Sequence, residues 1–538
     1  MPTVREVTFE LLRSHGMSTI FGNPGSTELP MLADFPDDFR YVLGLQELVV
    51  MGMADGYAQA TGRPTHVNLH TAPGVGNAVG GIFNAQANHS PLLITAGQQV
   101  RAHVTIEANL TNRDAVIGPQ PYVKWAHEPP RAQDVPGAIA RAIHHCSIPP
   151  RGPAFVSIPM DDWNQEADAD RAANAIARTV TGRVRPDRGM LELLAQRLRR
   201  AAAPVLIAGP DIDATGGWQG AVELAEAQRL PVWASPATGG NRLGFPESHP
   251  QFVGVLPLAI GPASEALRGH DLILVVGSSV FPYYPYLPGP LLPEGAELVM
   301  ITSDPGEAAR APMGEAIIGD PALALVALRE LAGASERPLP DPRSAPGAPA
   351  PPPPEAPDRI SGSAAMAALA DVWPADAILV LEAPSVTLSA RNRLRIARPG
   401  SYFFGASGGL GFGIAAALGV QLACPQRPVV CVLGEGSAQY GITALWTAVA
   451  YKLPVTFLVL RNDEYAILKW FSALEQVTGA PGLDLPALDV AAVARGYGMT
   501  AREVSGREQL TEALREAIAV ADGPRLVQVP VAPGMWLD

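Results

Sequence analysis

The chain has 538 residues, of which 47% are hydrophobic and 17% charged, and its formal net charge is −13. This length exceeds what one hydrophobic core organises and predicts about three domains, while the composition excludes a disordered chain. The acidic balance, with no basic stretch, excludes a nucleic-acid partner.

The N-terminal residues mix charged and apolar side chains, so they show no signal peptide, and no apolar run is long enough to cross a bilayer. We therefore expect a cytoplasmic protein without a membrane partner. Cys146, Cys424 and Cys431 lie far apart, which excludes a disulfide framework and a zinc-type cysteine pattern. Buried, inert thiols are the expectation.

Proline-rich sequence between residues 338 and 357 predicts a linker over 337–358. A second boundary is expected near residue 180, where charged and Ala-rich sequence precedes a new strand at 204–208. The expected domains are 1–180, 181–336 and 359–538. Each contains short β-branched runs that end in Gly or Asp and are followed by helical patterns, which predicts an α/β fold with mostly parallel sheets flanked by helices.

The first and third segments share one order of features. In each, a helix precedes a proline, then a strand, a Gly-rich turn, a helix and a second apolar strand; the strands are expected at 64–70 and 91–96 and at 428–433 and 454–460. Chance agreement of Pro and Gly positions is the alternative. The shared order favours two related domains, each with a ligand crevice at the carboxyl ends of its strands.

In the third segment, Glu435 follows one expected strand and Asn462 follows the next, 27 residues later. One strand-helix-strand unit places both at neighbouring strand ends, where their oxygens can hold Mg2+ or Ca2+ against a diphosphate. Gly434 and Gly436 allow close approach of phosphate, and Ser437 is expected to start the next helix.

With these residues, the chain resembles the benzoylformate decarboxylase family of thiamine diphosphate-dependent enzymes. The matching stretches are residues 21–30, 45–47, 54–59, 68–70, 89–91, 96–99, 110–112, 123–125, 408–412, 444–446 and 470–471. The resemblance implies an N-terminal domain for the aminopyrimidine, a central Rossmann-like domain and a C-terminal domain for the diphosphate and metal.

The resemblance also implies the catalytic residues. Glu47 hydrogen-bonds the aminopyrimidine and so activates the cofactor, His70 transfers protons to substrate or intermediate, and Ser26 contacts the substrate carboxylate. Taken alone, each has a structural alternative: a helix-start carboxylate, a satisfied histidine and a Gly-Ser turn. The implied reaction removes CO2 from a small-molecule 2-oxo acid, benzoylformate or a close aryl relative, and releases the aldehyde.

Further positions carry over by the same resemblance. The cofactor contacts comprise Leu410, which wedges the cofactor into a bent shape, and Gly409, Gly436, Ser437, Ser385, Pro384, Tyr465, Ala466, Ile467 and Asn77. The metal ligands comprise Glu435, Asn462 and Glu464. The substrate pocket comprises Pro24, Gly25, Leu110, Tyr284, Phe404, Ile467 and Phe471. The family also implies a homo-oligomer, with a dimer as the minimal active unit and a tetramer as the expected assembly.

Three departures from the family pattern bear on chemistry. Tyr284 stands where the family has a second active-site histidine, and Tyr is a poor acid near neutral pH. Glu435 replaces the usual Asp, and its longer arm should alter metal geometry, most of all for Mg2+. Ile467 and Pro384 stand where the family has smaller or more polar residues, so Ile467 narrows the space for a phenyl ring.

Three rival functions follow from the residues. A smaller aliphatic 2-oxo acid, or carboligation as in acetolactate synthase, fits the altered pocket. A cofactor-binding paralogue without turnover fits Tyr284 and Glu435, although Glu47, Ser26 and His70 weigh against it. A flavin or nicotinamide enzyme is disfavoured, because residues 209–217 lack GxGxxG and are better read as a structural turn.

Overall fold

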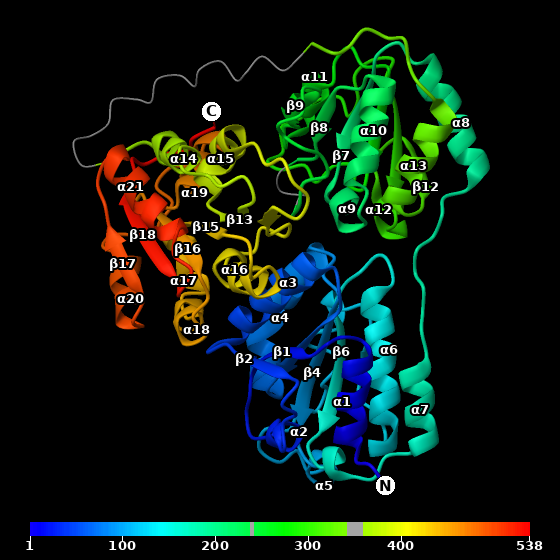
Figure 1. Ribbon diagram of the computed structural model, residues 1–538, viewed down its shortest axis with the longest axis vertical. Coiled ribbons are helices and arrows are strands. Elements are labelled where there is room, and N and C mark those ends of the chain that lie inside the picture. The colour runs from blue at the N-terminus through cyan, green and yellow to red at the C-terminus, as the bar shows by residue number, and fades with distance from the viewer. Residues whose placement is uncertain (237–240, 342–358, 538) are drawn as a thin grey trace.

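The computed structural model describes residues 1–236, 241–341 and 359–537. It contains three sheets, each of six strands that pair only in parallel (Figure 1). Of the expected linker, residues 342–358 lie outside the described part. Within the described part, no helix is long and apolar enough to cross a membrane.

The N-terminal sheet has the strand order β2-β1-β3-β4-β6-β5. Its strands are β1 (Thr19–Asn23), β2 (Arg40–Leu43), β3 (Thr65–Leu69), β4 (Leu92–Gln98), β5 (Ala126–His127) and β6 (Ala154–Pro159). The helices of this part are α1 (Val4–Ser14), α2 (Leu29–Leu32), α3 (Glu47–Thr61), α4 (Ala72–Ala87), α5 (Arg101–Val104), α6 (Val135–Ser147) and α7 (Ala169–Ala177), with short 3-10 turns at Gln120–Tyr122, Ala132–Asp134 and Asp162–Asn164.

The C-terminal sheet has the order β14-β13-β15-β16-β18-β17. Its strands are β13 (Ile378–Glu382), β14 (Tyr402–Phe404), β15 (Val429–Gly434), β16 (Val455–Arg461), β17 (Thr500–Glu503) and β18 (Arg525–Pro530). Its helices are α14 (Gly362–Ala370), α15 (Thr387–Leu394), α16 (Phe412–Ala423), α17 (Glu435–Tyr440), α18 (Ala444–Ala450), α19 (Ala466–Leu474), α20 (Val490–Gly496) and α21 (Arg507–Ile518), with a 3-10 turn at Pro384–Val386. Counted along the chain, this order repeats that of the first sheet strand for strand, as the shared sequence features predict.

The central sheet has a different order, β12-β11-β10-β7-β8-β9, which is that of dinucleotide-binding doubly wound folds. Its strands are β7 (Pro204–Ala208), β8 (Val232–Ala234), β9 (Phe252–Val255), β10 (Leu272–Val276), β11 (Glu297–Thr302) and β12 (Glu315–Ile318). Its helices are α8 (Arg188–Arg200), α9 (Pro210–Ala214), α10 (Trp218–Gln228), α11 (Ile260–Ala266), α12 (Pro305–Arg310) and α13 (Pro321–Ala332). Residues 209–217, where a turn was expected, contain the short helix α9 and the residues that flank it.

Helices α3 and α16 join the two related domains through small residues (Figure 1). A Cβ atom added to Gly56 would lie 2.3 Å from the carbonyl oxygen of Ala416, and one added to Gly419 would lie 1.9 Å from that of Met53. Glycine is therefore required at both positions for the helices to approach this closely. Apolar side chains of both domains form one continuous buried cluster around this contact.

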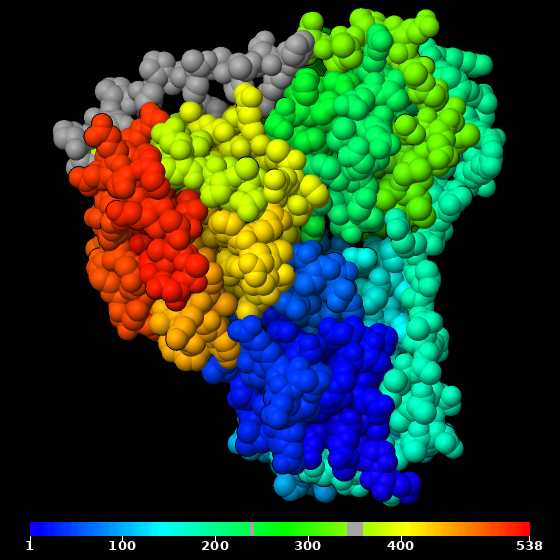
Figure 2. Space-filling view, in the orientation of Figure 1, coloured from blue at the N-terminus to red at the C-terminus, as the bar shows by residue number. Residues whose placement is uncertain are grey.

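The central domain meets both other domains, as the space-filling view shows (Figure 2). Asn241 donates a hydrogen bond of 2.9 Å to the Oε1 atom of Gln59 on α3. Glu247 accepts a hydrogen bond of 2.9 Å from the buried Arg391 on α15. The segment that follows β8 thus connects the N-terminal and C-terminal domains.

Candidate active site

Glu47 is the first residue of α3, which follows β2 after a short connection, residues 44–46. The helix begins here because the side chain of Gln46 accepts hydrogen bonds from the backbone N–H groups of Leu48 and Val49. The Glu47 carboxylate is 6% exposed and accepts one hydrogen bond per oxygen: 3.0 Å from Asn23 at the end of β1, and 3.1 Å from Asn77 on α4. Three elements therefore fix the position of this carboxylate.

His70 follows β3, and a buried carboxylate that was not predicted from the sequence contacts its imidazole. Its Nδ1 atom lies 2.9 Å from the Oε2 atom of Glu28, which is 1% exposed. The same Glu28 carboxylate accepts hydrogen bonds from the Gly25 N–H group, at 2.7 Å, and from the Thr27 hydroxyl, at 2.6 Å. An ionised Glu28 keeps the proton on Nδ1 and leaves Nε2 as the imidazole atom available for chemistry.

The turn after β1 carries Pro24, Gly25 and Ser26 next to this imidazole. A Cβ atom at Gly25 would lie 2.1 Å from His70 Nδ1, so only glycine lets the turn lie against the ring. Ser26, the next residue, is exposed. Leu110 adopts a left-handed backbone conformation with φ of 68°, and its carbonyl oxygen accepts a 2.8 Å hydrogen bond from Thr71 Oγ1. The predicted catalytic residues and part of the predicted pocket thus lie after the carboxyl ends of β1, β2 and β3.

Glu435 and Asn462 lie at the ends of the neighbouring strands β15 and β16, as their spacing predicts. The Glu435 Oε1 atom accepts hydrogen bonds from the backbone N–H groups of Asn462, at 3.1 Å, and Asp463, at 2.6 Å. Burial raises the pKa of Glu435 to about 7. Helix α17 begins at Glu435, two residues before the predicted start, because β15 continues into the helix without a loop.

Glu464, the third predicted metal ligand, has both carboxylate oxygens occupied by other groups. Oε2 lies 2.5 Å from the Lys469 ammonium, and Oε1 accepts a 3.0 Å hydrogen bond from the Gly534 N–H group. Through these two contacts, the Glu464 carboxylate links α19 to the C-terminal segment at Gly534.

The Gly-rich segment before α16, which carries Gly409 and Leu410, is fixed by a buried carboxylate. Glu382, at the end of β13, accepts hydrogen bonds from the Gly411 and Gly413 N–H groups, the latter at 2.7 Å. Burial raises the pKa of Glu382 to about 8. On the other side, Asn84 of α4 donates a 3.3 Å hydrogen bond to the Gly409 carbonyl oxygen. Elements of both related domains thus hold this segment.

The remaining predicted cofactor positions lie along the same edge of the C-terminal sheet. Tyr465 packs over Gly436, where a Cβ atom would lie 2.8 Å from its ring. Ser437 is buried in the first turn of α17, whereas Ala466 and Ile467 begin α19. Pro384 and Ser385 form the 3-10 turn after β13.

Two aromatic side chains of the predicted substrate pocket touch across domains. Tyr284 of the central domain and Phe471 of α19 have ring centroids 4.8 Å apart, and Tyr284 is 53% exposed. Ile467 lies one turn before Phe471 on α19. Phe404 ends β14 and stacks on the buried Tyr402, with centroids 6.5 Å apart. The described contacts do not join Phe404 to the Tyr284 pair.

Three supporting residues were not singled out from sequence: Asn23, Glu28 and Glu382. Glu28 offered a weak signal, since a carboxylate that soon follows a Gly-Ser turn can fold back on that turn. Asn23 and Glu382 stand at strand ends, where sheet order decides which side chains meet. Asn77, expected to contact the cofactor, donates a hydrogen bond to Glu47.

Comparison with known proteins identifies the class. Residues 2–116, 191–328 and 384–529 match the N-terminal TPP binding, central and C-terminal TPP binding domains of the thiamine pyrophosphate enzymes. The chain belongs to this family.

Its similarity extends over the whole length of individual relatives. It is 52% identical to the benzoylformate decarboxylase of Pseudomonas aeruginosa, across 98% of this chain and 99% of that protein. It superposes on the thiamine diphosphate-dependent 4-hydroxybenzoylformate decarboxylase of Rhodococcus jostii with a TM-score of 0.95, 44% identity and full coverage of both chains. For the benzoylformate decarboxylase of Polynucleobacter necessarius the TM-score is 0.94 and the identity 40%, over 99% of each chain.

Proposed function

We propose that this protein uses thiamine diphosphate to decarboxylate benzoylformate, or an aryl 2-oxo acid close to it, to the aldehyde and CO2. The supporting observation is that a chain 52% identical to a benzoylformate decarboxylase also holds Glu47 and His70 in fixed hydrogen-bonded positions. Full-length similarity to two structures of the same class supports the same reaction.

The chain's own residues have distinct tasks in this reaction. Bound thiamine diphosphate supplies an electron sink for the electron pair that remains when CO2 leaves. Glu47, oriented by Asn23 and Asn77, shares a proton with the aminopyrimidine ring. His70 presents Nε2 for proton transfer to the substrate side, and Ser26 donates a hydrogen bond to the substrate carboxylate. Leu410, on the segment that Glu382 holds, would support the bound cofactor.

The C-terminal residues fit a divalent cation and a diphosphate. Glu435 is a buried carboxylate whose raised pKa reflects burial, with a further contribution from the negative charge of Asp463. A bound cation offsets such a charge. Glu435 and Asn462 would supply side-chain oxygens to Mg2+ or Ca2+, and Glu464, with its carboxylate occupied, retains its main-chain carbonyl. The proposed cofactor contacts are Gly409, Gly436, Ser437, Ser385, Pro384, Tyr465, Ala466, Ile467 and Asn77.

Glu47 and His70 belong to the N-terminal domain, whereas Glu435 and Asn462 belong to the C-terminal domain. We propose that Glu47 of one subunit works with the diphosphate residues of another, so that a dimer is the minimal active unit and a tetramer the assembly. A cytoplasmic location completes the proposal.

The test is an assay of the purified protein with thiamine diphosphate and Mg2+. The panel contains benzoylformate, 4-hydroxybenzoylformate, pyruvate and a branched aliphatic 2-oxo acid, and both CO2 and aldehyde are measured. We expect the highest kcat/KM with an aryl substrate. Absence of both products from every substrate would overturn the proposal, and a ligated product formed with an added aldehyde acceptor would identify a carboligase.

One observation favours a second candidate, the decarboxylation of a smaller aliphatic 2-oxo acid. The branched Ile467 side chain lies on the same helix as Phe471, which packs against Tyr284. This arrangement reduces the room for a phenyl ring. The same panel separates the two candidates through the order of kcat/KM values.

A further inference from the structure

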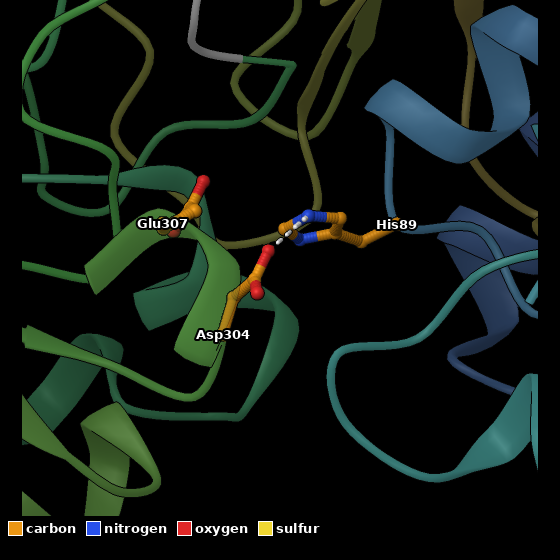
Figure 3. A group of neighbouring side chains, drawn as sticks. All are labelled: His89, Asp304 and Glu307. Atoms are coloured by element: carbon orange, nitrogen blue, oxygen red, sulfur yellow. Dashed lines mark ion pairs between the residues drawn. The ribbon is translucent and has the colours of Figure 1, made fainter. Parts of the chain in front are cut away.

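His89 lies in the turn between α4 and β4, and it faces the central domain (Figure 3). Its backbone adopts a left-handed conformation with φ of 53°. Opposite it, Asp304 is the N-cap residue of α12 and Glu307 lies in the first turn of that helix. An imidazole of the N-terminal domain therefore meets two carboxylates of the central domain.

The polar atoms of His89 and Asp304 lie farther apart than hydrogen-bond partners do. His89 Nε2 lies 3.9 Å from Asp304 Oδ2, whereas N–H···O hydrogen bonds span about 2.7–3.2 Å. One ligand atom from each of His89, Asp304 and Glu307 lies within 4.8 Å of the other two. Two ligands that each lie about 2.1 Å from one divalent ion are separated by roughly 3–4 Å.

Each of the three side chains also has a partner on its outer side. Asp211 Oδ1 lies 3.5 Å from His89 Nδ1, and a proton held on Nδ1 leaves the Nε2 lone pair directed at Asp304. Thr302 donates a 2.9 Å hydrogen bond to Glu307 Oε2, and a metal ion at Oε1 would displace the 3.3 Å hydrogen bond from the largely exposed Arg310. The Gly306 N–H group donates a 2.7 Å hydrogen bond to Asp304 Oδ1. Metal-binding histidines and carboxylates typically have such outer partners.

Three carboxylates, those of Asp211, Asp304 and Glu307, lie around one imidazole. The largely exposed Arg310 lies 3.3 Å from Glu307, and the charges of Arg151 and Lys124 act on Asp211 and Asp304. A cavity of about 400 Å³ adjoins His89; its lining includes Asp211 and Ser303, the residue before Asp304, and also Arg151, Arg183 and Arg242.

We propose that His89, Asp304 and Glu307 bind a divalent transition-metal ion of the Zn2+ type, and that this ion links the N-terminal domain to the central domain. Imidazole combined with carboxylate favours Zn2+ over Ca2+ or Mg2+, which prefer oxygen ligands alone. Water completes the coordination. Asp211 is a positioning residue that orients His89. This site shares no residue with the proposed catalytic site, so neither proposal depends on the other.

The experiment uses the purified protein with thiamine diphosphate and saturating Mg2+, so that the diphosphate site is filled. Zn2+ is titrated against a competing indicator dye, and the melting temperature is recorded with and without Zn2+. We expect one Zn2+ per chain and a higher melting temperature in the wild type. Both effects should be lost in His89→Gln and Asp304→Asn, and Asp211→Asn should weaken Zn2+ binding by about 10–100-fold.

Asp304→Asn should leave the fold intact, because asparagine can replace aspartate as the N-cap of α12. His249→Gln is the matched control: it removes another histidine that pairs with a carboxylate, Glu226 at 3.2 Å, and it should leave Zn2+ binding unchanged. The proposal is overturned if the wild type takes up no more Zn2+ than His89→Gln or Asp304→Asn does, or if Zn2+ leaves its melting temperature unchanged.

Discussion

The Nδ1 atom of His70 lies 2.9 Å from the Oε2 atom of Glu28, and this buried contact fixes which imidazole nitrogen faces the proposed substrate. Glu28 also ties the Gly25 N–H group and the Thr27 hydroxyl to the same place. The imidazole, the turn and the carboxylate therefore form one hydrogen-bonded unit, and proton transfer by His70 should depend on all of it.

Glu28→Gln removes the charge that orients His70 while it keeps the shape of the side chain. We expect kcat to fall by about 10²-fold or more, because His70 loses its fixed tautomer. His70→Ala should lower kcat by roughly 10²–10⁴-fold. Steady-state kinetics with the best substrate provides the measurement, and Glu10→Gln, which changes an exposed carboxylate on α1, is the control. Full activity of Glu28→Gln would show that the contact is only structural.

Ile467→Ala enlarges the space beside Phe471 and Tyr284. We expect the ratio of kcat/KM for benzoylformate to that for pyruvate to rise by about 10–200-fold, because even one methylene in a hydrophobic pocket is worth about 1–3 kcal/mol. Leu474→Ala, at the exposed end of the same helix, is the control. An unchanged ratio would mean that Ile467 does not limit substrate size.

Glu435→Asp shortens the proposed metal ligand to the length usual in the family. We expect half-maximal activation at a lower Mg2+ concentration than in the wild type, because Mg2+ requires near-ideal octahedral geometry. Activity measured after chelation and readdition of Mg2+ or Ca2+ gives this value for both proteins. An equal or higher Mg2+ requirement in the variant would show that the longer arm is accommodated by the site.

Glu382 should make stability depend on pH. Its folded pKa, about 8, lies above the ordinary 4.5, so the folded state binds more protons between these values. The contribution of Glu382 to the free energy of unfolding therefore decreases as pH rises from about 4.5 to about 8. Glu382→Gln lacks this titration, so its unfolding free energy, measured by denaturant titration at several pH values, should gain relative to wild type as pH rises. Parallel pH curves for the two proteins, as expected for the exposed control Glu508→Gln, would contradict this.

Much of the fold was predictable because parallel sheets impose local patterns. Apolar runs that end in Gly or an acid identified β7 and β15 to within a residue. The shared order of Pro and Gly positions in the first and third segments predicted two related domains, and their sheets have the same strand order. The spacing of Glu435 and Asn462 placed them on adjacent strand ends because one strand-helix-strand unit has a nearly fixed length.

The supporting contacts were not predictable, because sheet order rather than chain distance brings them together. Asn23 and Asn77 reach Glu47 from elements on either side of it, and a single Asn gives no pattern in the sequence. Glu382, at the end of β13, accepts a hydrogen bond from the Gly-rich segment before α16. His89 meets Asp304 only because two domains, folded separately, touch at that point.

The duplication also shows how one framework serves two tasks. Helices α3 and α16 each follow the second strand of their sheet and pack against each other, yet α3 begins with the Glu47 carboxylate and α16 follows the Leu410 segment. In the proposed function, these equivalent helix starts have different tasks: Glu47 shares a proton with the cofactor in one domain, and Leu410 supports the cofactor in the other.

The central claim is that Glu47 activates the bound cofactor. The most direct measurement is the rate of C2 proton exchange of thiamine diphosphate bound to wild type and to Glu47→Gln, together with CO2 release from the best substrate. We predict rapid exchange and turnover in the wild type, and loss of both in Glu47→Gln while the cofactor remains bound. Exchange and turnover at wild-type rates in Glu47→Gln would contradict the account.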